Sequence, residues 1–285
     1  MPTTQSRPLA DPAEAPTAAA GRPPLISARM ALTVDRLLHT RPATVVAIRA
    51  ETPTIRVLEL EPPAGFHHEA GQYLVLRIET EDGPDLRPLS IASPPGASTI
   101  ELATRLGASS FKRALATLEP GATVSVSRAR GKFRLDTKRP AVIVTGGIGI
   151  APIRSMLYHA VAQGYEHPIR LVYANRTPEE IAFRDELADL AATFPPSLEI
   201  SWIVSRTSGA SVGATGMHAG HVDDDVLRPH VDALPDARFY LTGPAPMVAD
   251  MRAALRHAGV RRRRVRSSEQ TLPIDRLAHR NQERS

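Results

Sequence analysis

The chain has 285 residues, of which 42% are hydrophobic, enough for one large or two ordinary domains with real cores. It contains no cysteine, which excludes disulfide bonds, thiolate zinc sites and cysteine-ligated iron–sulfur clusters of its own. The net charge of +5 comes almost wholly from arginine, but aromatic residues make up only 4% and none interrupts the run at 261–264, which argues against nucleic-acid binding.

The N-terminal region predicts neither a signal nor a folded unit. Residues 1–40 are rich in proline, alanine and threonine and predict a disordered extension, in which Met30 is an alternative start. No apolar run in the chain reaches the about 18 residues that a membrane-spanning helix needs, and a secretory signal pattern is missing. We therefore expect no membrane span and a cytoplasmic location. The histidines, His67 and His68 included, show no metal-ligand spacing, so we predict no metal site.

Residues 41–138 predict a small antiparallel β-barrel. Apolar residues recur at every second position in short segments, which clusters rich in proline, glycine and aspartate separate. The predicted strands cover 44–50, 54–60, 71–80, 86–93, 98–106 and 123–129. One helix interrupts them, with Ser109 or Ser110 as its cap and Pro120-Gly121 after its end. Six short strands at this spacing are typical of a closed barrel.

Residues 139–270 predict a different architecture. Apolar strands now alternate with helices, which implies parallel pairing with crossovers and a doubly wound sheet. The predicted strands cover 141–146, 169–175, 199–205 and 239–244, and the predicted helices cover 151–163, 178–193 and 246–258. We place the boundary between the two domains near 136–140 and treat 271–285 as a C-terminal tail.

Two loops at the ends of predicted parallel strands are candidate ligand sites, because ligands of such sheets bind beyond the carboxyl ends of the strands. The first, Gly146–Pro152, joins an apolar strand to a helix, whose N-terminus favours a phosphate. The second is Thr242–Pro244. The first loop matches neither the G-x-G-x-x-G pattern nor the Walker A motif, so taken alone it is either a phosphate loop or a tight turn.

A third candidate lies in the barrel, where Arg87 and Ser90 share one predicted strand. An arginine there can hold a phosphate through two parallel hydrogen bonds. Taken alone, the segment is more typical of an exposed strand arginine beside a core leucine.

Taken together, six motifs resemble the ferredoxin–NADP reductase-like family in identity and order. They are Gly71-Gln72-Tyr73, Arg87-Pro88-Leu89-Ser90, Gly107-Ala108-Ser109-Ser110, Arg130-Gly131-Lys132-Phe133, Gly146–Pro152, and Thr242-Gly243-Pro244 with Met247. The resemblance covers about residues 42–260 and is to members without a fused iron–sulfur domain. It implies two domains, an antiparallel Greek-key β-barrel for FAD followed by an α/β doubly wound parallel sheet for NAD(P), with hydride passing from nicotinamide to flavin N5 where they meet.

The resemblance also implies roles for individual residues. Arg87 would contact the FAD diphosphate with Ser109 or Ser110, Ser90 would hydrogen-bond near flavin N5, and Thr242 would border the nicotinamide. The implied cofactor-binding residues are Arg87, Pro88, Leu89, Ser90, Gly107, Ser109, Ser110, Gly146, Gly147, Gly149, Pro152, Ser205, Arg206, Thr242, Gly243 and Pro244, with Ser90 and Thr242 as the catalytic pair.

The chain departs from the family pattern at the flavin. The family usually has an aromatic residue at the position of Leu89, and the loss of ring stacking costs about 0.5–1.5 kcal/mol, up to about tenfold in flavin affinity. Many relatives carry cysteine at the position of Thr242 and an aromatic residue near the C-terminus, whereas here no aromatic residue follows Tyr240. We therefore expect a loosely held flavin and an altered geometry for hydride transfer.

The nucleotide preference rests on two strand ends. The second parallel strand ends in Asn175-Arg176, where a ribose-binding acid is usual, and Ser205-Arg206 ends the third strand, where the family has its 2′-phosphate site. Arginine favours a phosphate by charge and geometry, so we predict NADPH over NADH, while the abundance of arginine in the chain keeps NADH open.

Three functions are compatible with these motifs. The first is an FAD-dependent oxidoreductase that passes electrons from NAD(P)H to a separate acceptor protein, such as a ferredoxin, a flavodoxin or an oxygenase component. The second is an NAD(P)H:flavin reductase with free flavin as its substrate, which the leucine and the missing aromatic cover favour. The third is a non-catalytic nucleotide-binding regulatory subunit, because a fold alone does not prove chemistry.

Overall fold

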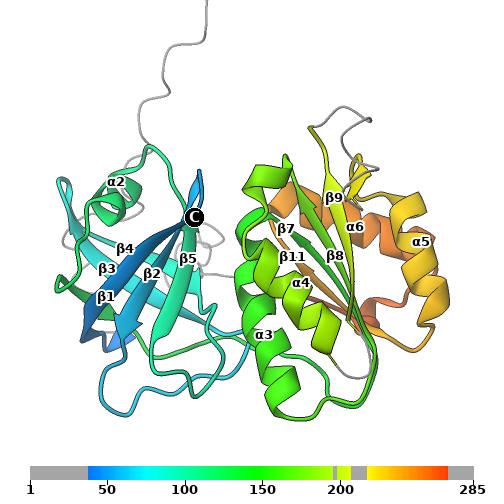
Figure 1. Ribbon diagram of the computed structural model, residues 1–285, viewed down its shortest axis with the longest axis horizontal. Helices are drawn as coiled ribbons and strands as arrows, with labels where there is room; N and C mark the ends of the chain where they lie inside the picture. Colours follow the sequence, from blue (N-terminus) through cyan, green and yellow to red (C-terminus); the bar gives the residue numbers. More distant parts are fainter. Residues whose placement is uncertain (1–37, 195–197, 207–216, 269–285) are drawn as a thin grey trace, which may run out of the picture.

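The computed structural model describes residues 38–194, 198–206 and 217–268, and it places two β-sheets side by side (Figure 1). The predicted disordered extension lies outside the described residues up to position 37, and the predicted tail, 271–285, lies wholly outside them. One sheet is built from the first half of the chain and the other from the second half. Both parts of the predicted fold class are confirmed.

The first sheet is an antiparallel barrel. Its strands are β1 (Arg41–Thr52), β2 (Ile55–Glu61), β3 (Tyr73–Thr80), β4 (Gly83–Ser90), β5 (Ile100–Arg105) and β6 (Thr123–Val126). They are ordered β4-β3-β6-β1-β2-β5, and an antiparallel bridge between Ile91 and Leu102 joins the two edges. The alternating apolar residues point inward, where leucines and valines such as Val45, Leu58 and Leu76 form a closed core.

One helix, α2 (Ser110–Ala116), packs at the end of this barrel. Ser109 is its N-cap, with its hydroxyl accepting a hydrogen bond from the backbone N–H of Lys112. Phe111 and Leu115 are buried in the barrel core, as the helical spacing predicted.

The second sheet is wholly parallel. Its strands are β7 (Ala141–Gly146), β8 (Ile169–Asn175), β9 (Leu198–Val204), β10 (Met217–Ala219), β11 (Arg238–Thr242) and β12 (Val265–Ser267). Their order, β10-β9-β8-β7-β11-β12, shows that the chain builds outward from β7 first in one direction and then in the other. The loops after β7 and β11 therefore flank the point where the strand order reverses, which is where open α/β sheets bind ligands.

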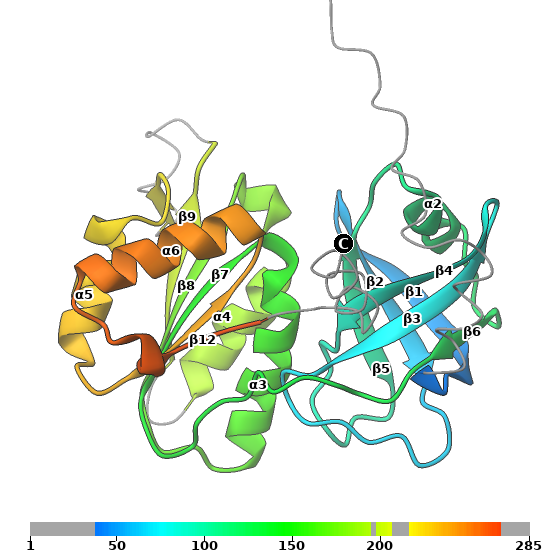
Figure 2. The same cartoon turned by 180° about the vertical axis from the view of Figure 1, so that it is seen from behind.

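Helices cover both faces of the parallel sheet (Figures 1 and 2). On one face α3 (Ile150–Ala162) and α4 (Arg184–Thr193) bury their apolar residues against the strands. On the other face α5 (Asp224–Ala233) and α6 (Ala245–His257) do the same. Valine and isoleucine side chains of β7 and β8 are buried on both faces, which is why these strands are continuous apolar runs in the sequence.

The structure corrects the prediction of one long helix over 178–193. A 3₁₀ turn covers Pro178–Glu180, and α4 begins only at Arg184. Between them Ile181, Ala182 and Phe183 are buried against the rest of the protein, and Phe183 has a left-handed backbone with φ 58°. The pull of three apolar side chains into the interior outweighs the helical preference of this segment.

Three further elements were not predicted: β10, α5 and β12. Helix α5 was missed because it contains Pro229 in its interior, where proline usually indicates the end of a helix. Its N-cap, Asp223, is of an ordinary kind. Strands β10 and β12 have three residues each and lie at the two edges of the sheet, so they carry too little periodicity to be recognised.

The barrel and the parallel sheet share one continuous interior. Ile55, Val57 and Ala103 from the barrel belong to the same buried cluster as Ile153 and Leu157 of α3. The two sheets are therefore packed together along α3. We call this contact between the barrel and α3 the seam.

Candidate functional site

A cavity of about 1050 Å³ lies at this seam. The barrel contributes residues of β4, β5 and α2, and the parallel sheet contributes the ends of β7, β8, β9 and β11. The lining includes Leu89, Ser90, Ala103, Thr104, Arg105, Lys112, Gly146, Gly147, Ile148, Gly149, Ala174, Asn175, Arg176, Glu180, Ser205, Thr242, Gly243, Pro244, Met247, Ser267 and Ser268. Leu89 and Ser90 of the barrel thus face the same space as the glycine loop.

The two loops of the parallel sheet are packed backbone to backbone. A Cβ atom at Gly149 would lie 2.9 Å from both the backbone nitrogen of Gly243 and the carbonyl carbon of Thr242, closer than real Cβ contacts come. Gly243 itself has a φ of 145°, which strongly favours glycine. Glycine at 149 therefore allows the loop after β7 to touch the loop after β11, and together they close one wall of the cavity.

The opposite wall comes from the barrel strand β4. Ser90 is buried at the end of β4, and Leu89 packs half-buried against the barrel core while it also lines the cavity. Thr242, at the end of β11, is 5% exposed and lines the same cavity from the other sheet. The described residues that line this cavity include no phenylalanine, tyrosine or tryptophan.

Arg87, the predicted diphosphate ligand, does not line the cavity. Its guanidinium forms an ion pair with Asp85 and lies over the ring of Phe111, 5.5 Å from the ring centroid. The side chain of Asp85 is only 1% exposed, and this burial raises its pKa, while the attraction of Arg87 opposes the rise. Neither Pro88 nor Arg87 is among the lining residues, so the structure places the two on the barrel side of the wall.

Two cations that the motif analysis missed do line the cavity, Arg105 at the end of β5 and Lys112 in α2. Arg105 donates hydrogen bonds to Thr54 (2.7 Å) and to Glu180 (3.2 Å). Burial lowers the pKa of Lys112, and repulsion by Arg105 and then Arg87 lowers it further. The three cations form a cluster whose mutual repulsion an anion would relieve.

The remaining barrel candidates surround this cluster. Gly107 is exposed, and the side chain of Lys112 passes over it, since a Cβ there would lie 3.0 Å from the lysine Cδ. Ser109 caps α2 and Ser110 is buried, and neither of them lines the cavity. The sequence held one signal for Lys112: it is one of only three lysines, two residues after a predicted diphosphate motif.

We expect replacement of Lys112 by methionine to weaken the binding of a diphosphate-bearing cofactor by about tenfold or more, because a charge-assisted hydrogen bond is lost. In the wild type, binding should be tightest below the lowered pKa of Lys112 and should weaken as the pH rises through it. Titration of the apoprotein with FAD between pH 7 and 10 measures both effects. A methionine variant with the wild-type pH profile would contradict this role.

At the nucleotide end, the structure separates the predicted residues. Ser205 lines the cavity, but Arg206 is exposed and does not, and Arg176 takes its place in the wall. The two arginines are neighbours, because the backbone N–H of Arg206 donates to the carbonyl of Arg176 at 2.7 Å. Pro152 is buried in the first turn of α3, away from the wall. The segment 205–222 is rich in glycine and serine, so the sequence predicts a mobile loop there, and most of it, 207–216, lies outside the described residues.

A second hollow, of about 1320 Å³, adjoins the first. Its lining comes from the segment 130–133 that leaves the barrel and from the end of α6 with β12. Seven cationic residues line it, namely Arg130, Lys132, Arg252, Arg256, Arg262, Arg263 and Arg266. Within the described parts of the chain, its lining holds no carboxylate. This basic groove shares Arg252, Ser267 and Ser268 with the cavity, so the two are continuous.

Other kinds of site find no support in the described ranges. Among residues 38–194, 198–206 and 217–268, no three histidine or carboxylate side chains come close enough to bind a metal ion. Over the same ranges, every helix is too short or too polar to span a bilayer.

Known proteins resemble the chain in both halves. The family model of the oxidoreductase NAD-binding domain matches residues 143–253. The reductase component of propane 2-monooxygenase from Mycolicibacterium goodii is 31% identical over 72% of this chain and 60% of its own length. Ferredoxin–NADP reductase B from Sorangium cellulosum is 37% identical over 52% of this chain and 64% of its own length. The chain thus spans somewhat under two thirds of these relatives.

A solved structure shows the same fold. A ferredoxin NADP⁺ reductase from Neisseria gonorrhoeae, with bound FAD and NADP, superposes with a TM-score of 0.70 over 80% of this chain and 98% of its own. The sequence identity is 20%, so this likeness concerns the arrangement of the two sheets.

Proposed function

We propose that this chain, which belongs to the ferredoxin–NADP reductase-like family, is an FAD-dependent oxidoreductase that takes hydride from NAD(P)H and passes electrons to a separate acceptor protein. We assign 41–138 to its flavin domain and 139–270 to its nucleotide domain. One observation carries the proposal: Ser90 of the barrel and the loops at Gly146–Gly149 and Thr242–Pro244 line a single cavity. A donor and an acceptor held on opposite walls can therefore meet there.

The residues of the cavity fit a flavin dinucleotide on its barrel side. The cluster of Arg87, Arg105 and Lys112, of which Arg105 and Lys112 line the cavity, suits a diphosphate. Burial lowers the pKa of Lys112, and the two arginines lower it further. Ser90 offers a hydroxyl at the wall, and Leu89 offers an apolar surface. Bound there, FAD would supply the ability to accept a hydride and to release the two electrons singly.

The parallel sheet offers the complementary half. Gly146, Gly147 and Gly149 line the cavity before the first turn of α3, which suits the diphosphate of a nicotinamide nucleotide. Thr242 and Pro244 line the same cavity as this loop and Ser90. Arg176, with Arg206 beside it, supports the preference for NADPH over NADH. The reduced nucleotide is a cytoplasmic metabolite, so a cytoplasmic location belongs to this proposal.

A second candidate function, an NAD(P)H:flavin reductase, is favoured by the wall itself. Leu89 presents no ring to a flavin, and no phenylalanine, tyrosine or tryptophan of the described residues lines the cavity. A weakly held flavin would leave as a product. A regulatory subunit that binds nucleotide without turnover is the third outcome to be distinguished.

The absorbance spectrum of the purified protein, followed by anaerobic addition of NADPH, separates these functions. We expect a yellow protein that bleaches on addition of NADPH. A colourless protein that oxidises NADPH only with added FAD or FMN would instead establish the flavin reductase. Binding of NADPH without oxidation, with or without flavin, would overturn both and leave the regulatory function. A parallel titration with NADH tests the assignment of Arg176 and Arg206.

The basic groove supports an acidic protein as the acceptor. Its seven cations lie directly beside the cavity, where a negatively charged partner would be both steered and held near the redox centre. One sequence relative of this chain is the reductase component of propane 2-monooxygenase, and its name implies a separate oxygenase. We therefore place the acceptor in this groove.

The charge-reversal variant R262E/R263E should raise the KM for an acidic ferredoxin by about tenfold or more, because electrostatic steering is lost. Wild-type reduction of ferredoxin should also fall as ionic strength rises. Added salt shortens the Debye length, which is about 8 Å at physiological salt, and so weakens the attraction between the groove and an acidic partner. NADPH oxidation with dichlorophenolindophenol, a small acceptor, is the control and should change little. Equal effects of the substitution on both acceptors would remove the groove from the electron-transfer path.

A further inference from the structure

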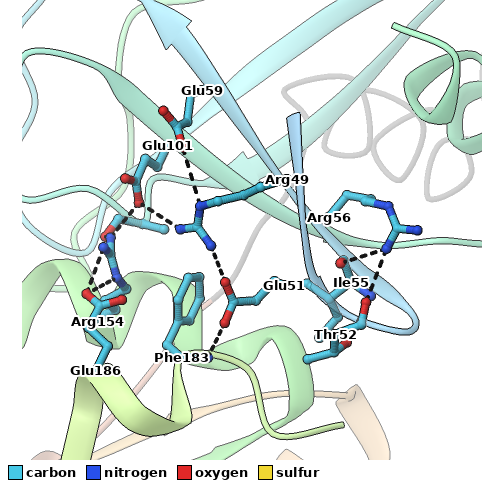
Figure 3. A network of polar contacts seen from close by, with 11 residues as sticks. Arg49, Glu51, Thr52, Ile55, Arg56, Glu59, Glu101, Arg154, Phe183 and Glu186 are labelled. Carbon is cyan, nitrogen blue, oxygen red and sulfur yellow. Dashed lines mark hydrogen bonds and ion pairs between the residues drawn. The ribbon is translucent and has the colours of Figure 1, made fainter. Parts of the chain in front are cut away.

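We propose that Arg154 is a positioning residue that holds the flavin side of the cavity and the glycine loop at one fixed separation. The proposal rests on the function proposed above, and it assigns to that reaction a residue that touches neither reacting group. It follows from a network of polar contacts, with the buried Arg154 among partly buried charges, between the barrel and the parallel sheet (Figure 3).

Arg154 is an unusual arginine because it is buried in the interior of the seam. Only 8% of the residue is exposed. Its Nη1 donates to the carbonyl oxygen of Ala92 at 2.9 Å and to Oε2 of Glu101 at 2.7 Å, and its Nε donates to Oε1 of Glu186 at 2.8 Å. The guanidinium also lies over the ring of Phe183, 4.9 Å from the centroid. One side chain thus binds the barrel, α3 and α4 together.

The contacts of Arg154 fall close to the proposed reacting groups on both sides. Arg154 lies in the first turns of α3, five residues after Gly149 of the glycine loop. Ala92, its barrel partner, lies two residues after Ser90. Directly beside it, the hydroxyl of Ser155 donates to the carbonyl of Ser93 at 2.8 Å, and both serines are buried. Two adjacent residues of α3 therefore hold two adjacent carbonyls next to the cavity wall.

A second layer of charges holds the first in place. Arg49 of β1 reaches Glu59 at 3.3 Å and Glu101 at 3.8 Å, and it also pairs with Glu51. The other carboxylate oxygen of Glu51 accepts the backbone N–H of Phe183 at 2.7 Å. Figure 3 shows these side chains as a continuous chain from Glu59 and Arg49 to Arg154 and Glu186. Each charge of the layer has an opposite charge beside it.

Such a network defines geometry more than it adds stability. Desolvation of buried ions offsets most of their attraction, so hydrophobic residues of equal size often stabilise a protein as well or better. Charge-assisted hydrogen bonds, however, are directional, and a planar guanidinium donates its hydrogen bonds only in fixed directions. Hydride transfer needs reacting atoms about 3–3.5 Å apart, and a displacement of about 1 Å costs about 100-fold in rate. Arg154 therefore acts on the reaction through distance.

The absence of cysteine makes this separation measurable. Val46 on β1 and Val161 on α3 are exposed, at 47% and 40%, and can be replaced by cysteines that carry spin labels. Pulsed electron paramagnetic resonance on V46C/V161C reports the distribution of distances between barrel and parallel sheet. We expect one narrow distribution without further substitution and a broad one when R154M is added. The matched control is R170M, which breaks the Arg170–Glu199 pair within the parallel sheet, away from the seam.

Kinetics supply the second measurement. R154M should lower the rate of flavin reduction at saturating NADPH by about 10-fold to 100-fold, with the dissociation constant for FAD and the KM for NADPH changed less than about threefold. R154K should restore little, since a single ammonium cannot reproduce the planar fork. R154M removes the arginine that pairs with Glu186 and leaves Glu101 with Arg49 alone. R154M/E101Q/E186Q removes the three charges together and keeps the test open if R154M does not fold.

The possible results separate cleanly. A broad distance distribution with slow flavin reduction supports the proposal. A narrow distribution in both R154M and the triple variant overturns it, even if either variant unfolds more easily, because Arg154 would then be structural only. If the wild type oxidises no NADPH, the proposed function fails, whereas the distance measurement still decides whether Arg154 fixes the two sheets.

Discussion

Replacement of Arg87 by alanine is expected to abolish flavin retention on purification and to lower the free energy of unfolding by about 3 kcal/mol at neutral pH. The two losses have different causes. Flavin retention falls because the cationic cluster with Arg105 and Lys112 loses one of its three charges. Stability falls because Asp85, 1% exposed in its side chain, is left as a buried carboxylate without its partner.

The pH dependence separates these causes. Burial raises the pKa of Asp85, and removal of Arg87 raises it further, so the variant folds with a protonated Asp85 once the pH falls below that raised pKa. The stability difference between variant and wild type should therefore be largest at neutral pH and should shrink as the pH falls. Urea unfolding at several pH values measures it.

The double variant D85N/R87A is the matched control for the fold. It removes the buried charge together with the guanidinium, so its stability should return most of the way to that of the wild type, while flavin retention stays poor. Flavin retained by D85N/R87A at the wild-type level would show that Arg87 serves only to neutralise Asp85. The diphosphate would then have to be held by Arg105 and Lys112 alone.

Replacement of Gly149 by alanine should lower kcat/KM for NADPH by about 100-fold, because a shift of about 1 Å at the reacting groups has an effect of this size. The added Cβ would lie 2.9 Å from backbone atoms of Thr242 and Gly243, which have no flexible end to move aside. The two loops must separate, and Thr242 moves away from the wall that faces Ser90. Steady-state kinetics with NADPH measure the loss.

Gly146 provides the comparison within the same loop. A Cβ there would collide with the sulfur of Met247, but a thioether at the end of a flexible side chain can turn away. G146A should therefore lose several-fold less activity than G149A, and both should bind FAD like the wild type, since the contacts lie on the parallel sheet. Equal losses in the two variants would contradict the backbone contact between the loops.

Much of the architecture could be predicted because its signals are local. The alternation in 44–50 and 54–60, the apolar runs at 141–146 and 169–175, and the Ser109 cap each reflect contacts within a few residues. The prediction of a helix over 178–193 was wrong for the converse reason. The conformation of Ile181–Phe183 is set by packing against residues far away in the sequence and not by their neighbours. The edge strands β10 and β12 have three residues each, too few to show an alternation of apolar and polar residues.

The candidate site divides in the same way. The glycine loop, Ser90 and Thr242 were found because short motifs mark them, and the structure brings them to one cavity. Lys112 and Arg105 belong to no motif, and Arg176 was noted only where an acidic residue is usual. They line the cavity because α2 begins there and β5 and β8 end there. For Arg87 the motif named the residue but not its buried partner Asp85.

The amino-acid sequence alone predicts a barrel followed by a doubly wound sheet with two nucleotide motifs. It does so because turn residues and the spacing of apolar residues are properties of neighbouring positions. The separation between Ser90 and Gly149, the burial of Arg154 and the gathering of seven cations in one groove are visible only in the folded chain. They depend on how two sheets pack along α3, and that packing sums many contacts between residues far apart in sequence.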